Sequence, residues 1–293
     1  MRILLIGNTG QVGWELQRTL YPLGEIIALD YPAVDLLDLD RTRKLISQIQ
    51  PQAIINAAAY TDVDRAETEQ ELAFAVNATA PGWLAEEARK IGSVFVHYST
   101  DYVFDGEKGT AYTEKDLPKP INVYGKSKLA GEQLVEAVDG AYLIFRTSWV
   151  YSLRKKCFVT QVLRWGREQK EMRVVDDQVG SPTWCRYLAE VTAQILAKAN
   201  GKIVEWVSER KGIYHLAGKG SASRYAWAMS ILANDPQKDQ QIVKKIHKAK
   251  SSDFPTSACR PANSSLACEK ISDVFGVHVP AWDELLPLAL RNS

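Results

Sequence analysis

Apolar residues in the first half of the chain gather in short, nearly continuous runs. Such runs predict buried strands of a parallel sheet, because both faces of that kind of sheet are covered. The predicted strands are Ile3–Ile6, Ile26–Leu29, Ala53–Asn56, Val94–Tyr98 and Leu143–Phe145. Amphipathic stretches that predict helices lie between them, at Gln11–Leu20, Asp40–Ile49, Glu71–Ile91 and Gly125–Val138. This alternation predicts βαβ units and an open, doubly wound α/β sheet.

The second half of the chain has a more mixed pattern. It predicts strands at Arg173–Asp176 and Ile213–Leu216, and helices at Cys185–Ala199, Ala222–Ala233 and Ala281–Leu290. Gln237–Lys250 is rich in lysine and is expected to be a solvated helix face or a connection. We predict a first domain over residues 1–150 and a smaller α/β substrate domain over 151–293, with 185–199 able to pack back onto the first domain.

Composition is that of an ordinary globular protein and disfavours several function classes. The 293 residues are 46% apolar and 24% charged, and the formal net charge of +1 creates no global field that attracts nucleic acid or acidic membranes. Ile3–Ile6 is too short for a signal peptide, and no later run is long enough to span a bilayer. The four cysteines lack metal-ligand spacing and are expected to be reduced thiols in a cytoplasmic protein.

A glycine-rich segment follows the first predicted strand and opens the first predicted helix. Gly7 permits a tight turn, Gly10 lets the backbone approach a pyrophosphate, and Gly13 lets the helix pack close to the sheet. The N–H groups of the helix N-terminus then face the anion. The spacing is G-x-x-G-x-x-G, and its place directly after a strand predicts a Rossmann-type domain that binds a nicotinamide dinucleotide.

Two further segments are placed to contact that cofactor. Asp30 closes the second predicted strand, where an acid binds the ribose hydroxyls and repels a 2′-phosphate, which favours NADH. Ala57, Ala58 and Ala59 end the third strand with small side chains, which suit either a bound cofactor or tight packing.

A long loop, Val103–Val123, leads into a helix that carries Tyr124 and Lys128 on one face. A free tyrosine has a pKa of about 10, which a nearby ammonium lowers, so the pair suits proton transfer to or from a substrate. Thr100 ends the fourth strand and is the predicted donor that polarises a carbonyl. Asp101 and Tyr102 are candidate substrate contacts.

These motifs resemble those of the extended short-chain dehydrogenases, and more closely those of the dTDP-4-dehydrorhamnose reductase family. The resemblance runs through most of the chain, and its matching segments are GNTGQVGWEL (7–16), NAAAYTDVDRAE (56–67), VNA (76–78), HYSTDYVFDG (97–106), NVYGKSKLAGE (122–132), FRTSWVY (145–151), DQVGSPT (177–183) and RPANS (260–264). It implies a dinucleotide domain followed by a smaller sugar-nucleotide domain. It also implies reduction of the C4 ketone of dTDP-4-dehydro-6-deoxy-L-mannose by NADH or NADPH.

The resemblance assigns roles to individual residues. Gln11 and Val12 correspond to positions at the pyrophosphate, Asp30 to the ribose, and Asp35 and Leu36 to the adenine.

Other matching residues lie along the predicted cleft. Ala57–Ala59 correspond to positions beside the cofactor, and Thr100, Tyr124 and Lys128 to the catalytic set. Asp101 and Trp149 correspond to positions that face the sugar, although Trp149 also suits a core aromatic.

Other functions on the same scaffold remain open. A 4,6-dehydratase needs an Asp-Glu pair directly after the threonine, whereas Tyr102 follows Asp101 here, so only half of that pair is present. A 4-epimerase or another sugar-nucleotide 4-ketoreductase is the nearest alternative. A non-catalytic regulatory subunit of the methionine adenosyltransferase type shares the scaffold and belongs to a different class.

Some members of the resembling family are dimers that a Mg²⁺ bridges through glutamates. Glu15 occupies the position of the first such ligand, whereas Arg186 and Asn292 occupy the other two. Neither Arg186 nor Asn292 supplies a carboxylate, which Mg²⁺ needs in order to give up its water. We therefore expect no metal site, and a monomer or a metal-independent homodimer.

Overall fold

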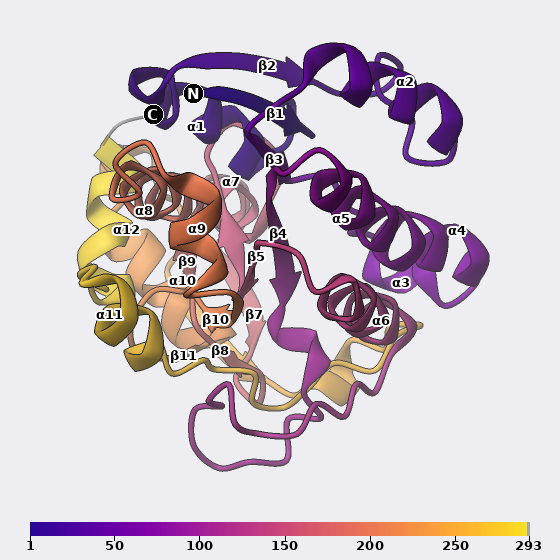
Figure 1. Ribbon diagram of the computed structural model, residues 1–293. Coiled ribbons are helices and arrows are strands. Elements are labelled where there is room, and N and C mark those ends of the chain that lie inside the picture. Colours follow the sequence, from indigo (N-terminus) through magenta and orange to yellow (C-terminus); the bar gives the residue numbers. More distant parts are fainter. Residues whose placement is uncertain (292–293) are drawn as a thin grey trace.

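The computed structural model describes residues 1–291 and is built around a six-stranded parallel sheet (Figure 1). The strand order is β10-β5-β4-β3-β1-β2. The strands are β1 (Arg2–Ile6), β2 (Glu25–Leu29), β3 (Ala53–Asn56), β4 (Val94–Thr100), β5 (Tyr142–Thr147) and β10 (Gly212–His215). The order reverses between β1 and β3, which is the switch point where ligands bind in such sheets. The Rossmann-type fold class is confirmed.

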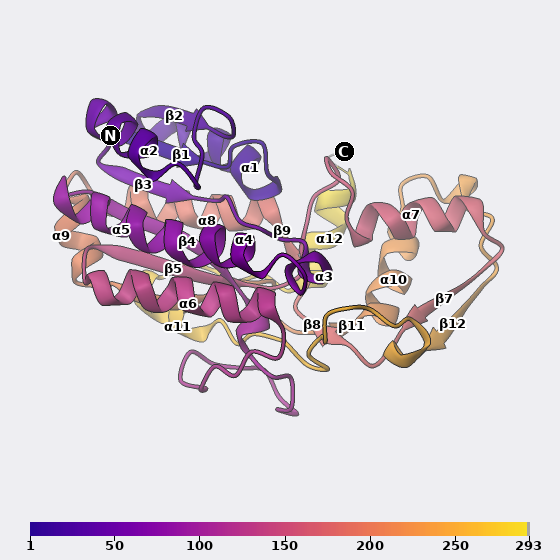
Figure 2. The same cartoon turned by 90° about the vertical axis from the view of Figure 1, so that its right-hand side faces the viewer.

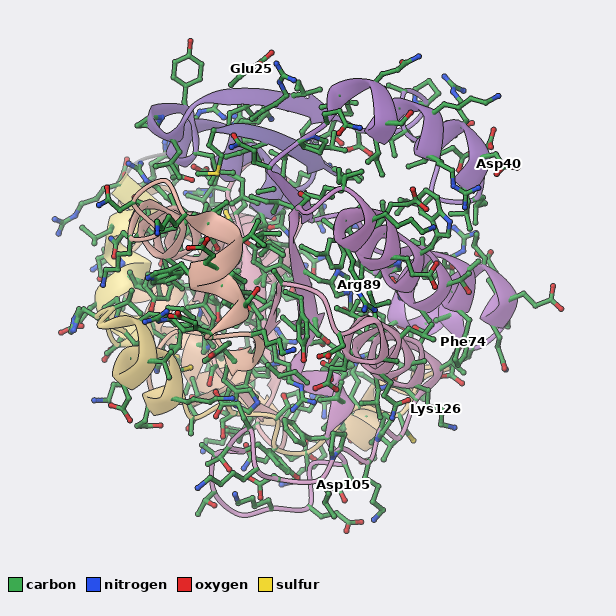
Figure 3. All side chains as sticks on the ribbon, viewed as in Figure 1. Glu25, Asp40, Phe74, Arg89, Asp105 and Lys126 are labelled. Carbon is green, nitrogen blue, oxygen red and sulfur yellow. The ribbon has the colours of Figure 1, made fainter. Side chains whose placement is uncertain are left out.

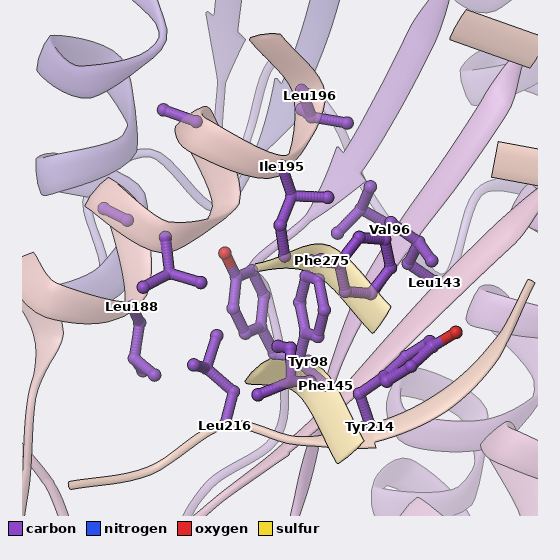
Figure 4. Packing of buried hydrophobic residues seen from close by; sticks show 14 of the residues in the cluster. Val96, Tyr98, Leu143, Phe145, Leu188, Ile195, Leu196, Tyr214, Leu216 and Phe275 are labelled. Carbon is purple, nitrogen blue, oxygen red and sulfur yellow. The ribbon is translucent and has the colours of Figure 1, made fainter. Parts of the chain in front are cut away.

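Helices cover both faces of this sheet. One face packs on α2 (Leu39–Ile49), α5 (Ala80–Lys90) and α6 (Val123–Val138). The other packs on α1 (Gln11–Thr19), α8 (Cys185–Ala197), α9 (Ile203–Ser208) and α11 (Glu269–Phe275). Figure 4 shows this second face, where Val96, Tyr98, Leu143 and Phe145 of the sheet meet Leu188, Ile195 and Leu196 of α8. Alternate residues of each strand therefore enter two separate cores, as a sheet covered on both sides requires.

The predicted helix Glu71–Ile91 is interrupted. It consists of α4 (Gln70–Phe74), a π-helical turn at Ala75–Thr79, and α5. Asn77, inside that turn, donates to the Tyr60 carbonyl and to the Ser127 hydroxyl, and its side-chain oxygen accepts from the Tyr60 N–H. The short helix α3 (Val63–Ala66) precedes α4. A buried asparagine with three partners thus fixes a helix irregularity that hydrophobic periodicity does not reveal.

A second layer lies beyond one end of the sheet (Figure 2). Its core surrounds the buried Trp227 and is contributed by α7, α10, α12 and β7. The elements are α7 (Phe158–Glu168), β7 (Glu171–Val175), α10 (Arg224–Ala233), β12 (Lys245–Ala249) and α12 (Trp282–Arg291). Two-residue strands tie the layers together: β6 (Val150–Tyr151) pairs with β9 (Thr183–Trp184), and β8 (Val179–Gly180) pairs with β11 (Ala222–Ser223).

The chain crosses between the two layers more than once. The 185–199 segment contains all of α8, which packs on α1, and β10 extends the first sheet at its β5 edge. Residues on both sides of position 151 therefore build the first core.

The expectation that Gln237–Lys250 is a helix face or a connection is wrong for its last part. Lys245–Ala249 is strand β12 and pairs in parallel with all of β7. Ile246 packs against the second core and Ala249 is buried, while His247 and Lys248 between them leave too weak an apolar alternation to predict a strand.

The long loop predicted before α6 is present and closely held. Figure 3 labels Asp105 within it. The Tyr112 ring stacks on Phe104 with centroids 4.2 Å apart, and the Tyr112 hydroxyl donates to Asp105. Among the described residues, no helix has the length and apolar character to cross a membrane.

Candidate active site

The carboxyl ends of β1, β3, β4 and β5 open into one cavity of about 480 Å³. Most of the residues predicted to bind cofactor or to catalyse line it together. They are Gly7, Gly10, Gln11, Val12, Asp30, Ala57, Ala58, Ala59, Thr100, Asp101, Tyr124, Lys128 and Trp149, joined by Thr9, Thr61, Tyr98, Ser99, Thr147, Val150 and Lys155. Asp35, Leu36, Gly13 and Tyr102 are not among the lining residues.

The glycine loop has the geometry that its spacing predicts. Gly7 has a φ of +86°, and a Cβ there would lie 2.6 Å from the Ala58 nitrogen. A Cβ on Gly13 would lie 2.0 Å from the Gly7 carbonyl oxygen, so Gly13 permits close packing of α1 on the loop. Gly10 precedes α1 without any side-chain cap, which leaves the first N–H groups of the helix for an anion.

Two buried polar atoms on the wall of this cavity lack a partner among residues 1–291. They are Gln11 Oε1 and Thr147 Oγ1. Buried polar atoms are nearly always hydrogen-bonded, so both atoms point to a ligand that fills the cavity.

Asp30 is held within its own loop. One carboxylate oxygen accepts from the Thr9 N–H at 3.1 Å and from the Thr9 hydroxyl at 2.6 Å, and the other accepts from the Tyr31 N–H at 2.8 Å. Burial raises the pKa of Asp30, but these hydrogen bonds and the nearby Lys155 ammonium outweigh it, so the net pKa is lowered. Asp30 is therefore an ionised carboxylate whose charge is partly offset by its surroundings.

Asp35 and Leu36, which the resemblance assigns to the adenine, do not line this cavity. Asp35 accepts from the Leu37 N–H, and Leu36 packs against the core under α2.

Tyr124 lies in the first turn of α6. The Asn122 side chain caps this helix by accepting from the Gly125 N–H at 2.7 Å. Burial raises the pKa of Tyr124, and a hydrogen bond with the Thr100 hydroxyl acts in the opposite direction. The Tyr102 ring packs edge-on against Tyr124 with centroids 5.9 Å apart. The phenol is thus protonated at neutral pH and already joined to the predicted carbonyl-polarising hydroxyl.

Lys128 is almost completely buried one turn further along α6. Its Nζ donates to the Tyr98 carbonyl at 2.6 Å and lies 3.1 Å from His97 Nε2. Burial lowers the pKa of Lys128 to about 8, and the carboxylate of Glu132 acts against that shift. Lys128 lines the same cavity as Tyr124, but in this structure its amine contacts His97 and the Tyr98 carbonyl of β4.

Asp101 is buried and surrounded by hydroxyl groups. Its carboxylate accepts from Thr100 at 3.1 Å, from Ser148 at 2.8 Å and from Ser264 at 2.5 Å. Burial raises its pKa to about 6, although these three bonds act in the opposite direction. Asp101 therefore titrates close to neutral pH at the cavity wall.

A second cavity of about 810 Å³ adjoins the first and shares Gln11, Thr61, Trp149 and Val150 with it. The Arg224 guanidinium lies 3.6 Å above the Trp149 ring, which in turn stacks on Trp227. Trp227 Nε1 has no partner among the described residues. This cavity offers aromatic faces and cationic groups together.

Several residues that line these cavities or hydrogen-bond to Asp101 were not predicted. Arg224, Trp227, Ser148 and the serine of the RPANS segment carry no local spacing signal, since their partners are far away in the sequence. The matching segments FRTSWVY and RPANS contain Ser148 and Ser264, and that is the one signal that points to them.

Two of the three residues aligned with a Mg²⁺ site, Glu15 and Arg186, lie in the described part of the chain. Arg186 donates to Glu190 at 2.8 Å on α8, and Glu15 is half-buried on α1 near Cys185. Asn292 lies outside the described residues.

Comparisons with known proteins agree with this geometry. The family model described as the RmlD substrate binding domain matches residues 1–293. A dTDP-4-dehydrorhamnose reductase of Burkholderia thailandensis is 40% identical over 295 residues, which is 100% of this chain and 99% of the relative. That of Escherichia coli K12 is 39% identical over 287 residues, which is 96% of this chain and 94% of the relative.

A solved structure extends the likeness to three dimensions. A dTDP-4-dehydrorhamnose reductase from Bacillus anthracis in complex with NADP superposes with a TM-score of 0.88 at 33% identity, and the match covers 100% of this chain and 99% of the other. The chain therefore belongs to the RmlD family, the family of the dTDP-4-dehydrorhamnose reductases.

Proposed function

We propose that this chain is an NAD(P)H-dependent reductase that converts the C4 ketone of dTDP-4-dehydro-6-deoxy-L-mannose to an alcohol and so forms dTDP-L-rhamnose. The observation that supports this proposal most strongly is that Thr100, Tyr124 and Lys128 line the same cavity as the glycine loop. Family membership narrows the substrate from ketones in general to a dTDP-linked sugar.

The residues present fit a nicotinamide dinucleotide. The uncapped start of α1, which Gln11 and Val12 begin, suits a pyrophosphate, and the unpartnered Gln11 Oε1 can accept from a hydroxyl of the cofactor. Ala57–Ala59 leave room along the third strand end, and Lys128 is the residue that would hold the nicotinamide ribose. Bound in reduced form, the cofactor supplies a hydride.

Both NADH and NADPH suit the part of the cavity beside Asp30. Asp30 disfavours a 2′-phosphate, but Thr9 and Tyr31 already donate to it, and Lys155 brings a positive charge into the same cavity. The balance of these charges supports use of NADH and tolerance of NADPH.

Tyr124 supplies the proton in this proposal. Because burial raises its pKa, the phenol is protonated at neutral pH, which is the state that a general acid requires. Negative charge develops on the ketone oxygen during reduction, and the Thr100 hydroxyl stabilises that oxygen while the proton moves from Tyr124 Oη to it.

The second cavity suits the nucleotide part of the substrate. Trp149 and Trp227 offer flat apolar surfaces, and Arg224, Arg260 and Lys156 offer positive charge for a diphosphate. The Arg260 guanidinium is anchored by Asp64 at 2.7 Å, which holds it in place before a ligand arrives. Gln11, Trp149 and Val150 line both cavities, so a ketosugar at this junction reaches Tyr124.

The test is oxidation of NADH and NADPH by the purified chain with dTDP-, UDP- and GDP-linked 4-ketosugars. We expect turnover with the dTDP-6-deoxy ketosugar and far less with the other nucleotides. Cofactor binding without ketone-dependent oxidation on any substrate would favour the regulatory-subunit alternative. Exchange of stereochemistry without net cofactor oxidation would favour an epimerase.

A further inference from the structure

A line of buried polar side chains runs beneath the cofactor cavity, from β3 through β4 to α6. Asn56 and His97 are neighbours in the register of β3 and β4, and neither side chain is exposed. Asn56 Nδ2 lies 3.3 Å from His97 Nδ1, and His97 Nε2 lies 3.1 Å from Lys128 Nζ. The proposed function uses Lys128 but assigns nothing to Asn56 or His97.

The orientation of Asn56 is fixed by the backbone. Its Oδ1 accepts from the Ala58 N–H at 3.1 Å, so the amide nitrogen, which is a donor, must face His97. His97 Nδ1 is then an acceptor. Burial holds the pKa of His97 well below its ordinary value, so the ring is neutral and carries its one hydrogen on the other nitrogen, Nε2.

That placement of the hydrogen on His97 constrains the protonation state of Lys128. The His97 Nε2–H group points at Lys128 Nζ, which accepts a hydrogen bond only as an uncharged amine. A charged Lys128 at this place would force the hydrogen of His97 onto Nδ1, opposite the N–H groups of Asn56. Two donors would then face each other in a dry interior, which is costly.

The other charged or titratable groups near the amine do not remove this constraint. Glu132, one turn further along α6, favours the charged amine, but Arg146 pairs with it through a hydrogen bond of 2.6 Å and Ser99 donates to it. Tyr124 is protonated, and β4 contributes the neutral His97 ring and the Tyr98 carbonyl.

We propose that Asn56 and His97 are positioning residues that favour the uncharged amine of Lys128 while the cavity is empty, so that at alkaline pH cofactor binding is accompanied by uptake of a proton by Lys128. The proton comes from solvent and forms the third N–H bond of the ammonium, which then donates to an acceptor on the cofactor ribose instead of facing His97. The inference rests on the proposed role of Lys128 toward that ribose.

Calorimetric titration of the chain with NADPH, in two buffers of different ionisation enthalpy, counts the protons taken up. Lys128 has a pKa of about 8 in the empty cavity, so uptake should be about 0.1 proton near pH 7 and about 0.9 near pH 9. The higher pH also avoids titration of Asp101, whose pKa is about 6.

Asn56→Asp is the matched variant, because it replaces one donor by an acceptor of the same shape. The aspartate accepts from His97 Nδ1–H, which frees Nε2 to accept from a charged Lys128. Proton uptake near pH 9 should fall at least threefold. Uptake equal to that of the original chain would show that burial alone discharges Lys128, and would overturn the role of Asn56 and His97.

Side-chain ¹⁵N spectra of the histidines test the same inference without a variant or a cofactor. Near pH 9, where Lys128 is mostly uncharged, His97 should be the Nε2–H tautomer. His215 serves as an internal reference of the opposite kind, because its Nδ1 faces the carbonyls of Tyr112 and Ala267. An Nδ1–H tautomer at His97 overturns the inference, as does NADPH binding without proton uptake. Failure to bind NADPH at all would instead contradict the proposed function.

Discussion

At the scale of single residues, Asp101 is an acid whose burial disfavours its charged form. Its pKa is raised to about 6 by burial, against three hydroxyl hydrogen bonds. An acid whose pKa is higher in the folded than in the unfolded chain binds more protons when folded, so stability falls as pH rises between the two pKa values. This group therefore destabilises the fold above about pH 6, and the penalty disappears toward about pH 4.

Asp101→Asn removes that charge and should stabilise the chain at neutral pH by on the order of 1–3 kcal/mol. Chemical denaturation followed by circular dichroism at several pH values measures this. The advantage should vanish near pH 4, and ketone reduction should be weakened because Asp101 lies on the cavity wall. An equal difference in stability at both pH values would contradict the buried-charge explanation.

Asp30 is the residue that sets cofactor preference in this account. Asp30→Ala should raise the KM for NADH, because a ribose partner is lost, and should lower the KM for NADPH, because repulsion of the 2′-phosphate is relieved while Lys155 remains. Steady-state kinetics with both cofactors provide the measurement. A selective loss of NADPH activity would show that Asp30 does not point at the ribose.

Residues with local motifs could be predicted from the sequence, and residues with distant partners could not. Gly7, Gly10 and Gly13 follow from spacing after a strand, and Tyr124 with Lys128 from one helical turn. His97 reads as one more residue of a buried strand, since its partners come from positions 41 residues before it and 31 after it.

At the scale of elements, Gly180 of the DQVGSPT segment packs directly against the side chain of Trp149, which follows β5. A Cβ on Gly180, in β8, would lie 2.3 Å from the Trp149 ring. Trp149 itself has a φ of +44°, in the left-handed region that residues other than glycine rarely adopt. Gly180 thus provides the space that lets Trp149 line both cavities.

Gly180→Ala should displace Trp149 and raise the KM for the dTDP-sugar several-fold, with a smaller effect on the KM for the cofactor. Gly109→Ala is the matched control, since a Cβ there meets nothing within 4 Å. Kinetics of both variants decide the matter. Unchanged kinetics in Gly180→Ala would mean that Trp149 does not contact the sugar.

Elements with strong apolar patterns were predicted, and those stabilised by pairing alone were not. The five predicted strands of the first half are β1 to β5 with bounds that differ by at most two residues at an end. In contrast, β12 has one half-buried isoleucine and a buried alanine among lysines, and its backbone bonds to β7 decide its conformation. Strands β8 and β11 have two residues each, which is too few for any periodicity to appear in the sequence.

At the scale of the whole molecule, the chain returns to its first sheet after residue 151. Tyr214 and Leu216, in and after β10, complete the core between the sheet and α8. A single domain boundary in the sequence cannot describe this arrangement, because long-range packing rather than local composition makes β10 pair with β5.

We expect activity to be independent of divalent metal. Glu15 is the one carboxylate at the three aligned positions, and Arg186 pairs with Glu190. Exhaustive treatment with EDTA should leave turnover unchanged, and added Mg²⁺ should not alter the hydrodynamic mass. A Mg²⁺-dependent shift to a dimer would show that other carboxylates complete a site.

The central claim is that Tyr124 donates a proton while a hydride reaches C4 of the sugar. The most direct test uses reduced cofactor deuterated at C4 of the nicotinamide, with NMR of the sugar product. We predict deuterium at C4 of dTDP-L-rhamnose, and a loss of roughly two or more orders of magnitude in kcat for Tyr124→Phe with little change in cofactor affinity. Absence of deuterium at C4, or near-normal turnover by Tyr124→Phe, would contradict the account.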